Sequence, residues 1–144
     1  MIQLREMTQE NFWEVIELKV NDKQKGFVLE NSISIAQSKI QPECIPLAIF
    51  NDGTLVGFLM YCIDRDDGNY WVYRLMIDRK YQRKGYAKKA MEVLLNEIKK
   101  DKNRNKIMLD VKMESIEAVE LYKSLGFYFT GQVFGTSHVM ELEY

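Results

Sequence analysis

Cysteine, proline and histidine are scarce in this chain of 144 residues, which has two cysteines, two prolines and one histidine. Cys44 and Cys62 have neither the spacing of a metal site nor the density of a disulfide-stapled domain, so we expect both to be reduced and buried. His138, the single histidine, lies away from every motif and is expected to have a structural or surface role. No metal site is predicted.

Long apolar runs are also missing. None approaches the roughly 18 residues of a membrane span, and the first residues (Met1 to Glu6) lack the apolar core of a signal peptide. The expected location is therefore the cytoplasm, with no membrane partner. No Gly/Ser-rich linker or repeat divides the chain, and its composition is 47% hydrophobic and 28% charged. We expect one domain over residues 1–144.

Neither sign of charge dominates, because the formal net charge is −1. A nucleic-acid partner is not predicted from such a balance. The positive charge is instead local: six of the eleven residues from Arg79 to Lys89 are lysine or arginine. This cluster suits a small polyanionic ligand.

Gly85 lies in that cluster, where a strand-like run (Tyr70 to Ile77) ends and an amphipathic helix begins. A glycine at such a junction lets backbone N–H groups turn toward one point, and the helix N-terminus adds the positive end of a dipole. The residues therefore predict an anion site, for which diphosphate is the usual ligand. The alternative is a solvated basic loop before an ordinary helix.

The hydrophobic pattern predicts alternating strands and helices along the whole chain. Thr8 is expected to cap a first helix carrying Phe12, Val15 and Ile16, and a second helix is expected over Gly26 to Ser38 with Ile33, Ala36 and Ile40 on its buried face. Ala87, Ala90, Met91, Leu94 and Ile98 give the clearest helical spacing. Ser115 can cap a short helix that ends at Gly126. Strands are expected at Ile2 to Arg5, Leu47 to Phe50, Leu55 to Ile63, Tyr70 to Ile77, Ile107 to Met113, Phe127 to Val133 and Ser137 to Tyr144.

Two motifs in this order resemble the GNAT superfamily of acetyl-CoA-dependent N-acetyltransferases. Gln82-x-x-Gly85-x-Ala87 matches the pattern Gln/Arg-x-x-Gly-x-Gly/Ala with which that family holds coenzyme A. About forty residues later, Ala118 to Phe127 looks like the family signature that ends in Leu-Tyr-x-x-Leu-Gly-Phe. The resemblance covers essentially the whole chain. It implies an α/β (α+β) fold: a mixed central sheet of about seven strands with four helices, in which an antiparallel meander becomes parallel through one crossover helix.

The resemblance also implies a cofactor site. Backbone groups of the strand around Leu75 and Ile77 would pair with the pantetheine amides in an opening of the sheet, and the glycine loop would hold the diphosphate. Ser115 departs from the asparagine of many relatives. The residues expected to bind acetyl-CoA are Leu75, Met76, Ile77, Gln82, Arg83, Lys84, Gly85, Tyr86, Ala87, Lys88 and Ser115.

Tyr122 is the expected catalytic acid, because a positioned phenol can give a proton to the departing thiolate. The alternative is a tyrosine that only packs beside Leu125. The base has no such candidate, since many relatives have a carboxylate where this chain has Tyr73. A protonated amine of pKa about 10.4 needs about 4 kcal/mol to become neutral near pH 7.4. Water, Tyr73, Glu30 or Asp78 are the routes left open for its proton.

The resemblance implies a primary amine as the acceptor. Two segments, Leu18 to Gln37 and Tyr70 to Asp78, look like those of bacterial spermine/spermidine (diamine) acetyltransferases, which favours a polyamine. Carboxylates and aromatic faces can hold a polycation, and the expected substrate-binding residues are Glu30, Trp71 and Tyr73. The alternatives are acetylation of a peptide or protein N-terminus, or a non-catalytic acyl-CoA-binding module. The aromatic closing strands are a plausible homodimer surface.

Overall fold

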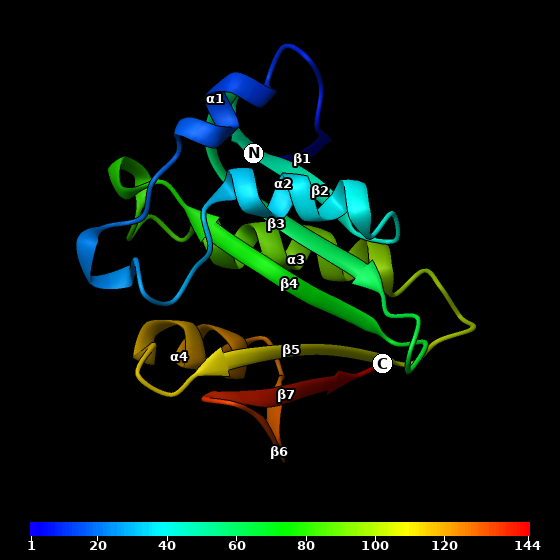
Figure 1. The fold of residues 1–144 in the computed structure, drawn as a ribbon. Coiled ribbons are helices and arrows are strands. Elements are labelled where there is room, and N and C mark those ends of the chain that lie inside the picture. The colour runs from blue at the N-terminus through cyan, green and yellow to red at the C-terminus, as the bar shows by residue number, and fades with distance from the viewer.

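A seven-stranded sheet forms the centre of the molecule, and helices cover both of its faces (Figure 1). The computed structural model describes residues 1–144. In chain order the elements are β1 (Ile2–Glu6), α1 (Phe12–Glu17), α2 (Asn31–Ile40), β2 (Ile45–Asn51), β3 (Thr54–Ile63), β4 (Tyr70–Ile77), α3 (Tyr86–Ile98), β5 (Lys106–Lys112), α4 (Ile116–Ser124), β6 (Tyr128–Phe134) and β7 (Ser137–Glu143). Two short 3-10 turns are added, η1 (Asp22–Gln24) and η2 (Arg79–Tyr81). The predicted order of strands and helices is confirmed.

The strands lie side by side in the order β1-β2-β3-β4-β5-β7-β6. Every neighbouring pair is antiparallel except β4 and β5, which are parallel and joined by the crossover helix α3. Asp52 and Gly53 make the turn between β2 and β3 with φ values of 49° and 84°, in the left-handed region that this tight hairpin requires. The expected change from an antiparallel meander to a parallel pair is therefore present.

The sheet separates two hydrophobic cores. The face toward α3 and α4 holds the larger one, which includes Met91 and Leu94 of α3 and Val119 of α4. The face toward α1 and α2 holds the smaller one, which includes Val15 of α1 and Met76 of β4. Both cysteines are free and buried on this second face, as expected.

The first two helices differ from their predicted extents. Helix α1 begins at Phe12 after Asn11 rather than after Thr8, although the Thr8 hydroxyl accepts a hydrogen bond from the Asn11 N–H at 3.1 Å. Helix α2 begins at Asn31, and its expected apolar face is wrong: Ile33 is 49% exposed and Ile40 is 81% exposed. Its buried side chains are polar, Asn31 and Ser34. The Asn31 amide donates to the Val15 carbonyl at 2.9 Å, so a hydrogen bond rather than an apolar stripe joins α2 to α1.

The C-terminal elements lie within a residue or two of their predicted positions, with one difference at a helix cap. Ser115 precedes α4, but its side chain makes no capping hydrogen bond, which corrects that expectation. Gly126 has φ of 102°, the left-handed conformation predicted for the end of this helix. Strand β6 lies at the edge of the sheet and is almost entirely exposed.

Candidate functional site

The sheet is open between β4 and β5 over most of the length of β4. Only Tyr70–Val72 pair with β5, opposite Ile107–Leu109. Beyond Val72 the two strands diverge, and residues 74–77 have a strand partner only on β3 (Figure 1). The edge of β4 that faces the opening therefore presents backbone N–H and C=O groups without a strand partner. This is the opening that the resemblance implied around Leu75 and Ile77.

A bulge in β4 lies at the point of divergence. Met60 of β3 is opposite Arg74 and Tyr61 is opposite Val72, so Tyr73 is an extra residue with no partner on β3. Such an insertion lets consecutive side chains point to the same face. The Tyr73 side chain packs in the core on the α1/α2 face, and the Arg74 guanidinium donates to Gln37 of α2 at 2.9 Å. Both side chains thus lie on the α2 side of the opening.

The glycine loop closes one end of the opening. Gly85 directly precedes α3 and has φ of 80°, and Arg83 has φ of 64°, so two residues of this short loop are left-handed. Such alternation turns successive N–H groups toward a common point. The first N–H groups of α3 have no acceptor within the helix, and the Arg83, Lys84 and Lys88 side chains are exposed around them. An anion can be held here.

Gln82 fastens the loop to the rest of the molecule. Its side-chain amide donates to the Ile77 carbonyl at 2.9 Å and to the Gln24 side chain at 2.8 Å, and its oxygen accepts from the Asn21 amide at 3.1 Å. One side chain therefore ties the end of β4 to the segment between α1 and α2. The family motif identifies Gln82, but it does not predict that the Gln82 side chain makes these hydrogen bonds within the protein.

A cavity of about 510 Å³ occupies the opening beside the loop. It is bounded by the end of β4, the glycine loop with the start of α3, the start of α4 and the segment Val20 to Val28. The predicted site residues that line it are Leu75, Met76, Ile77, Gln82, Arg83, Gly85, Tyr86, Ala87, Lys88, Ser115 and Tyr122. Lys84 is exposed and does not line it.

Tyr122 faces this cavity from α4. Its ring packs edge-on against Phe127 with centroids 6.0 Å apart, and its hydroxyl makes no hydrogen bond within the protein. Burial raises the pKa of Tyr122 to about 12, and the negative charge of Asp110 contributes in the same direction. The phenol is therefore protonated at neutral pH and able to donate.

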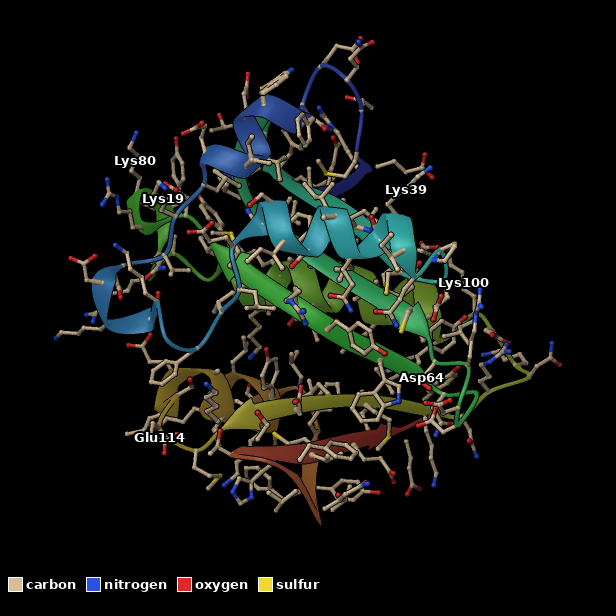
Figure 2. All side chains as sticks on the ribbon, viewed as in Figure 1. Lys19, Lys39, Asp64, Lys80, Lys100 and Glu114 are labelled. Atoms are coloured by element: carbon tan, nitrogen blue, oxygen red, sulfur yellow. The ribbon has the colours of Figure 1, made fainter.

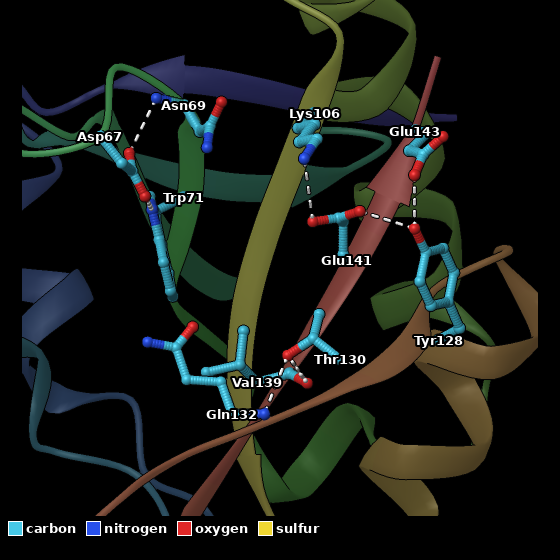
Figure 3. A network of polar contacts seen from close by, with 10 residues as sticks. All are labelled: Asp67, Asn69, Trp71, Lys106, Tyr128, Thr130, Gln132, Val139, Glu141 and Glu143. Atoms are coloured by element: carbon cyan, nitrogen blue, oxygen red, sulfur yellow. Dashed lines mark hydrogen bonds and ion pairs between the residues drawn. The ribbon is translucent and has the colours of Figure 1, made fainter.

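The three residues predicted to bind the substrate, Glu30, Trp71 and Tyr73, do not line the cavity. Trp71 is buried, and its indole N–H donates to Asp67 at 2.8 Å (Figure 3). The Tyr73 hydroxyl donates to Asp64 at 2.9 Å, and burial raises the pKa of Tyr73 above its ordinary value, so this phenol holds its proton. Glu30 is exposed just before α2.

The carboxylates considered from the sequence have different roles here. Asp78 is buried and accepts hydrogen bonds from the Lys19 N–H at 2.8 Å and the Lys80 N–H at 3.2 Å, so it holds the end of β4 in place. Asp64 also accepts the Asp66 N–H, which orders the turn between β3 and β4. That turn lies at the opposite end of β4 from Lys19 and Lys80 (Figure 2). The acidic and basic ends of the strand are thus well separated.

Two parts of the site were not predicted. The contacts of Asn21 and Gln24 have no signal in the sequence, because isolated polar residues in a loop are common. Asp110 of β5, which borders the opening but does not line the cavity, had a readable signal, since it interrupts the apolar face begun by Met108. Met108 is buried against the α1/α2 face whereas Asp110 is exposed.

No helix combines the length and apolarity that crossing a bilayer requires.

Comparison with known proteins agrees with this geometry. The spermine/spermidine N(1)-acetyltransferase of Bacillus subtilis (strain 168) is 28% identical over 138 residues, covering 92% of this chain and 91% of that protein. The PaiA N-acetyltransferase of Thermoplasma acidophilum, solved with coenzyme A, superposes with a TM-score of 0.74 at 22% identity, over 100% of this chain and 99% of that one. The spermidine N-acetyltransferase of Vibrio cholerae, solved with CoA and spermine, superposes with a TM-score of 0.78 at 18% identity. The match covers 99% of this chain and 95% of that one.

At such identities the two structural likenesses show the fold. The family follows from the sequence, because residues 6–127 match the model of the acetyltransferase (GNAT) family. This range contains both the glycine loop at the open end of the sheet and the tyrosine of α4. The chain therefore belongs to the GNAT family and is an N-acetyltransferase.

Proposed function

We propose that this protein transfers the acetyl group of acetyl-CoA to a primary amine of a polyamine such as spermidine or spermine. The observation that carries the proposal is the cavity itself, which places the glycine loop, the free edge of β4 and Tyr122 around one space. Its volume of about 510 Å³ falls in the usual range of small-molecule sites.

The residues present fit acetyl-CoA. The N–H groups after Gly85, with the surrounding lysines and Arg83, suit the diphosphate. The unpaired edge of β4 at Leu75 to Ile77 offers backbone donors and acceptors that suit the amides of the pantetheine arm. Acetyl-CoA supplies the activated thioester, and the amine nitrogen forms the new bond to its carbonyl carbon as the carbon–sulfur bond breaks. Tyr122 gives its proton to the departing sulfur.

The polyamine acceptor is supported by the relative from Bacillus subtilis, whose name specifies spermine and spermidine. In this chain, the α1/α2 side of the opening carries aromatic rings and exposed carboxylates. Glu30 is exposed before α2, and Trp71 and Tyr73 pack in the core on the α1/α2 face of the sheet. We propose that these three residues contribute to binding a polycation, with Trp71 and Tyr73 acting as walls because their polar atoms already have partners.

A steady-state screen tests the proposal. Acetyl-CoA is supplied with spermidine, spermine, single amino acids and peptides with free N-termini, and the released thiol is detected. We expect polyamines to have the highest kcat/KM. The KM for spermine should rise with ionic strength, because exposed charge pairs are screened within about 10 Å at 0.1 M salt. Peptides that exceed polyamines tenfold in kcat/KM would identify an N-terminal acetyltransferase instead.

Two variants sharpen the screen. Glu30→Gln should raise the KM for spermine without changing the affinity for acetyl-CoA. Glu92→Gln, which removes an exposed carboxylate from α3, is the matched control and should leave the KM unchanged. Binding of acetyl-CoA without turnover of any amine would indicate an acyl-CoA-binding module. A cytoplasmic location and pairing of two copies through β6 and β7 also stay predictions.

A further inference from the structure

We propose that the Asp110 carboxylate accepts the proton that the acceptor ammonium group must lose before it can attack the thioester. The inference rests on the proposed function, because it concerns the amine substrate of the same site. It fills a role for which the predicted residues are poorly placed, since Tyr73 holds its own proton and Asp78 is engaged by two backbone N–H groups.

The register of the sheet places Asp110 at the opening. Leu109 is the last residue of β5 that pairs with β4, and Asp110 is the next residue along the strand. On its other side Asp110 is opposite Val139 of β7. Val139 and Met108 both pack in the core on the α1/α2 face, so the alternation of the strand directs Asp110 to that face as well. Tyr73 and Arg74 point to this face from β4 across the gap.

Asp110 is also free to react. It is exposed, and its oxygens make neither a hydrogen bond nor an ion pair within the protein. The carboxylates of Asp64, Asp67, Asp78 and Asp101 all hold backbone or side-chain donors. A carboxylate without a partner beside a gap in the sheet can receive an ammonium group without breaking any contact of the folded protein.

Two cationic side chains, Arg74 and Lys112, lie on the same face of the sheet as Asp110. Arg74 of β4 is half-buried and held by the Tyr73 carbonyl and Gln37, each at 2.9 Å, and its Nε–H has no partner. Lys112 lies two residues along β5 on the same face and donates to the Gly26 carbonyl at 2.9 Å. Burial lowers the pKa of Arg74 and raises that of Tyr122, and the Asp110 charge makes a smaller, raising contribution to both. Val139 of β7 adds no charge.

Tyr122 and Asp110 thus border the opening from different elements, α4 and β5. The acceptor nitrogen approaches from the α2 side and gives a proton to Asp110. Its lone pair then forms the bond to the acetyl carbon, the electrons of the carbon–sulfur bond leave with sulfur, and Tyr122 protonates the sulfur. The nitrogen, positively charged once the new bond has formed, passes its second proton through water to the Tyr122 phenolate, and water removes the proton held by Asp110. Protons and electrons balance, and no further reactant is needed.

The test is the pH dependence of kcat/KM for spermidine in the parent and in Asp110→Asn. The parent accepts the charged amine, so its kcat/KM should change little between pH 7 and 9.5. Tyr122 keeps its proton throughout this range because its pKa is about 12. The variant depends on amine that is already neutral, so its kcat/KM should fall at least about 10²-fold at pH 7 and recover about tenfold per pH unit toward the amine pKa near 10.4.

Further measurements separate this role from a structural one. Asp110→Asn should keep the parent's acetyl-CoA affinity by calorimetry and its melting temperature, since Asp110 makes no hydrogen bond or ion pair within the protein. Asp110→Glu should restore part of the activity with the parent's flat profile, and Glu92→Gln should match the parent throughout.

If Asp110→Asn has the parental kcat/KM at pH 7, or loses the same factor in kcat/KM at every pH, Asp110 is not the proton acceptor. Either result would leave the assignment of the protein as an acetyltransferase unchanged. A parent that acetylates no amine would instead overturn the proposed function and this inference with it.

Discussion

Replacing Tyr122 by phenylalanine removes one hydroxyl group from the wall of the cavity and nothing else. That hydroxyl makes no hydrogen bond in the protein, so its loss leaves no donor or acceptor without a partner. The edge-on contact with Phe127, at 6.0 Å between centroids, is kept by a phenylalanine ring. The unfolding free energy should therefore change by less than about 0.5 kcal/mol, the usual range for substitutions that break no contact.

The effect on catalysis should be much larger. Loss of a general acid typically lowers turnover by about 10²-fold or more, which corresponds to about 2.7 kcal/mol of barrier. The affinity for acetyl-CoA should not change. A large loss of kcat with an unchanged melting temperature is thus the signature of an acid, whereas a packing residue would show the reverse. Steady-state kinetics, thermal unfolding and calorimetry on the same preparation give the three quantities.

Two comparisons control this experiment. Tyr122→Leu removes the ring as well and should lose the aromatic contact, worth about 0.5–1.5 kcal/mol, in addition to activity. Tyr128→Phe removes a hydroxyl from β6 that contacts Glu141 and Glu143 far from the cavity (Figure 3), and should leave kcat unchanged. Equal kcat in Tyr122→Phe and the parent would refute the role of Tyr122 as the acid.

Two further predictions concern the loop and the response to alkali. Gly85→Glu should lower the affinity for acetyl-CoA more than tenfold by calorimetry. The control is Gly68→Glu, also at a left-handed glycine with open space around it, which should carry similar backbone strain and leave the affinity unchanged. Equal affinities in the two variants would contradict the role of the glycine loop in binding acetyl-CoA. In the folded protein the pKa values of Tyr70 and Tyr122 are raised to about 12, against about 10 in the unfolded chain. The protonated phenols therefore contribute to the unfolding free energy in full below pH 10, and this contribution is lost as the pH rises from 10 through 12. Denaturant unfolding between pH 9 and 12 measures this loss, and a free energy independent of pH above 10 would show that the two phenols do not titrate as described.

Local sequence patterns predict the position and ends of those helices and strands that are determined mainly by residues close together in the chain. The spacing of Ala90, Met91 and Leu94 located α3, and Gly85 located its N-terminus, because both signals depend only on near neighbours. The predicted buried face of α2 is wrong because its contact with α1 is made by a hydrogen bond from the Asn31 amide. Such a tertiary hydrogen bond produces no periodic pattern of apolar residues in the sequence. The opening between β4 and β5 came from the family resemblance, since no residue of either strand encodes their divergence.

The contacts within the site were the least predictable part. Gln82 is expected at the cofactor site, and its side chain also contacts Gln24 and Asn21, which are about sixty residues away in the chain. Asp110 could have been noticed as a charged residue on an apolar strand face. Its relation to Tyr122 required the fold, because the two residues lie on different elements, β5 and α4.

The opening between β4 and β5 makes the sheet two plates that share only three residue pairs, Tyr70–Val72 with Ile107–Leu109. On the proposed function, acetyl-CoA bridges the plates as a removable strand, so the lifetime of the folded enzyme depends on the supply of its own substrate. A ligand at one hundred times its dissociation constant adds about 2.7 kcal/mol to the unfolding free energy. Without acetyl-CoA the enzyme should therefore unfold at a lower denaturant concentration, and be cleaved faster by protease, than it does with the ligand bound.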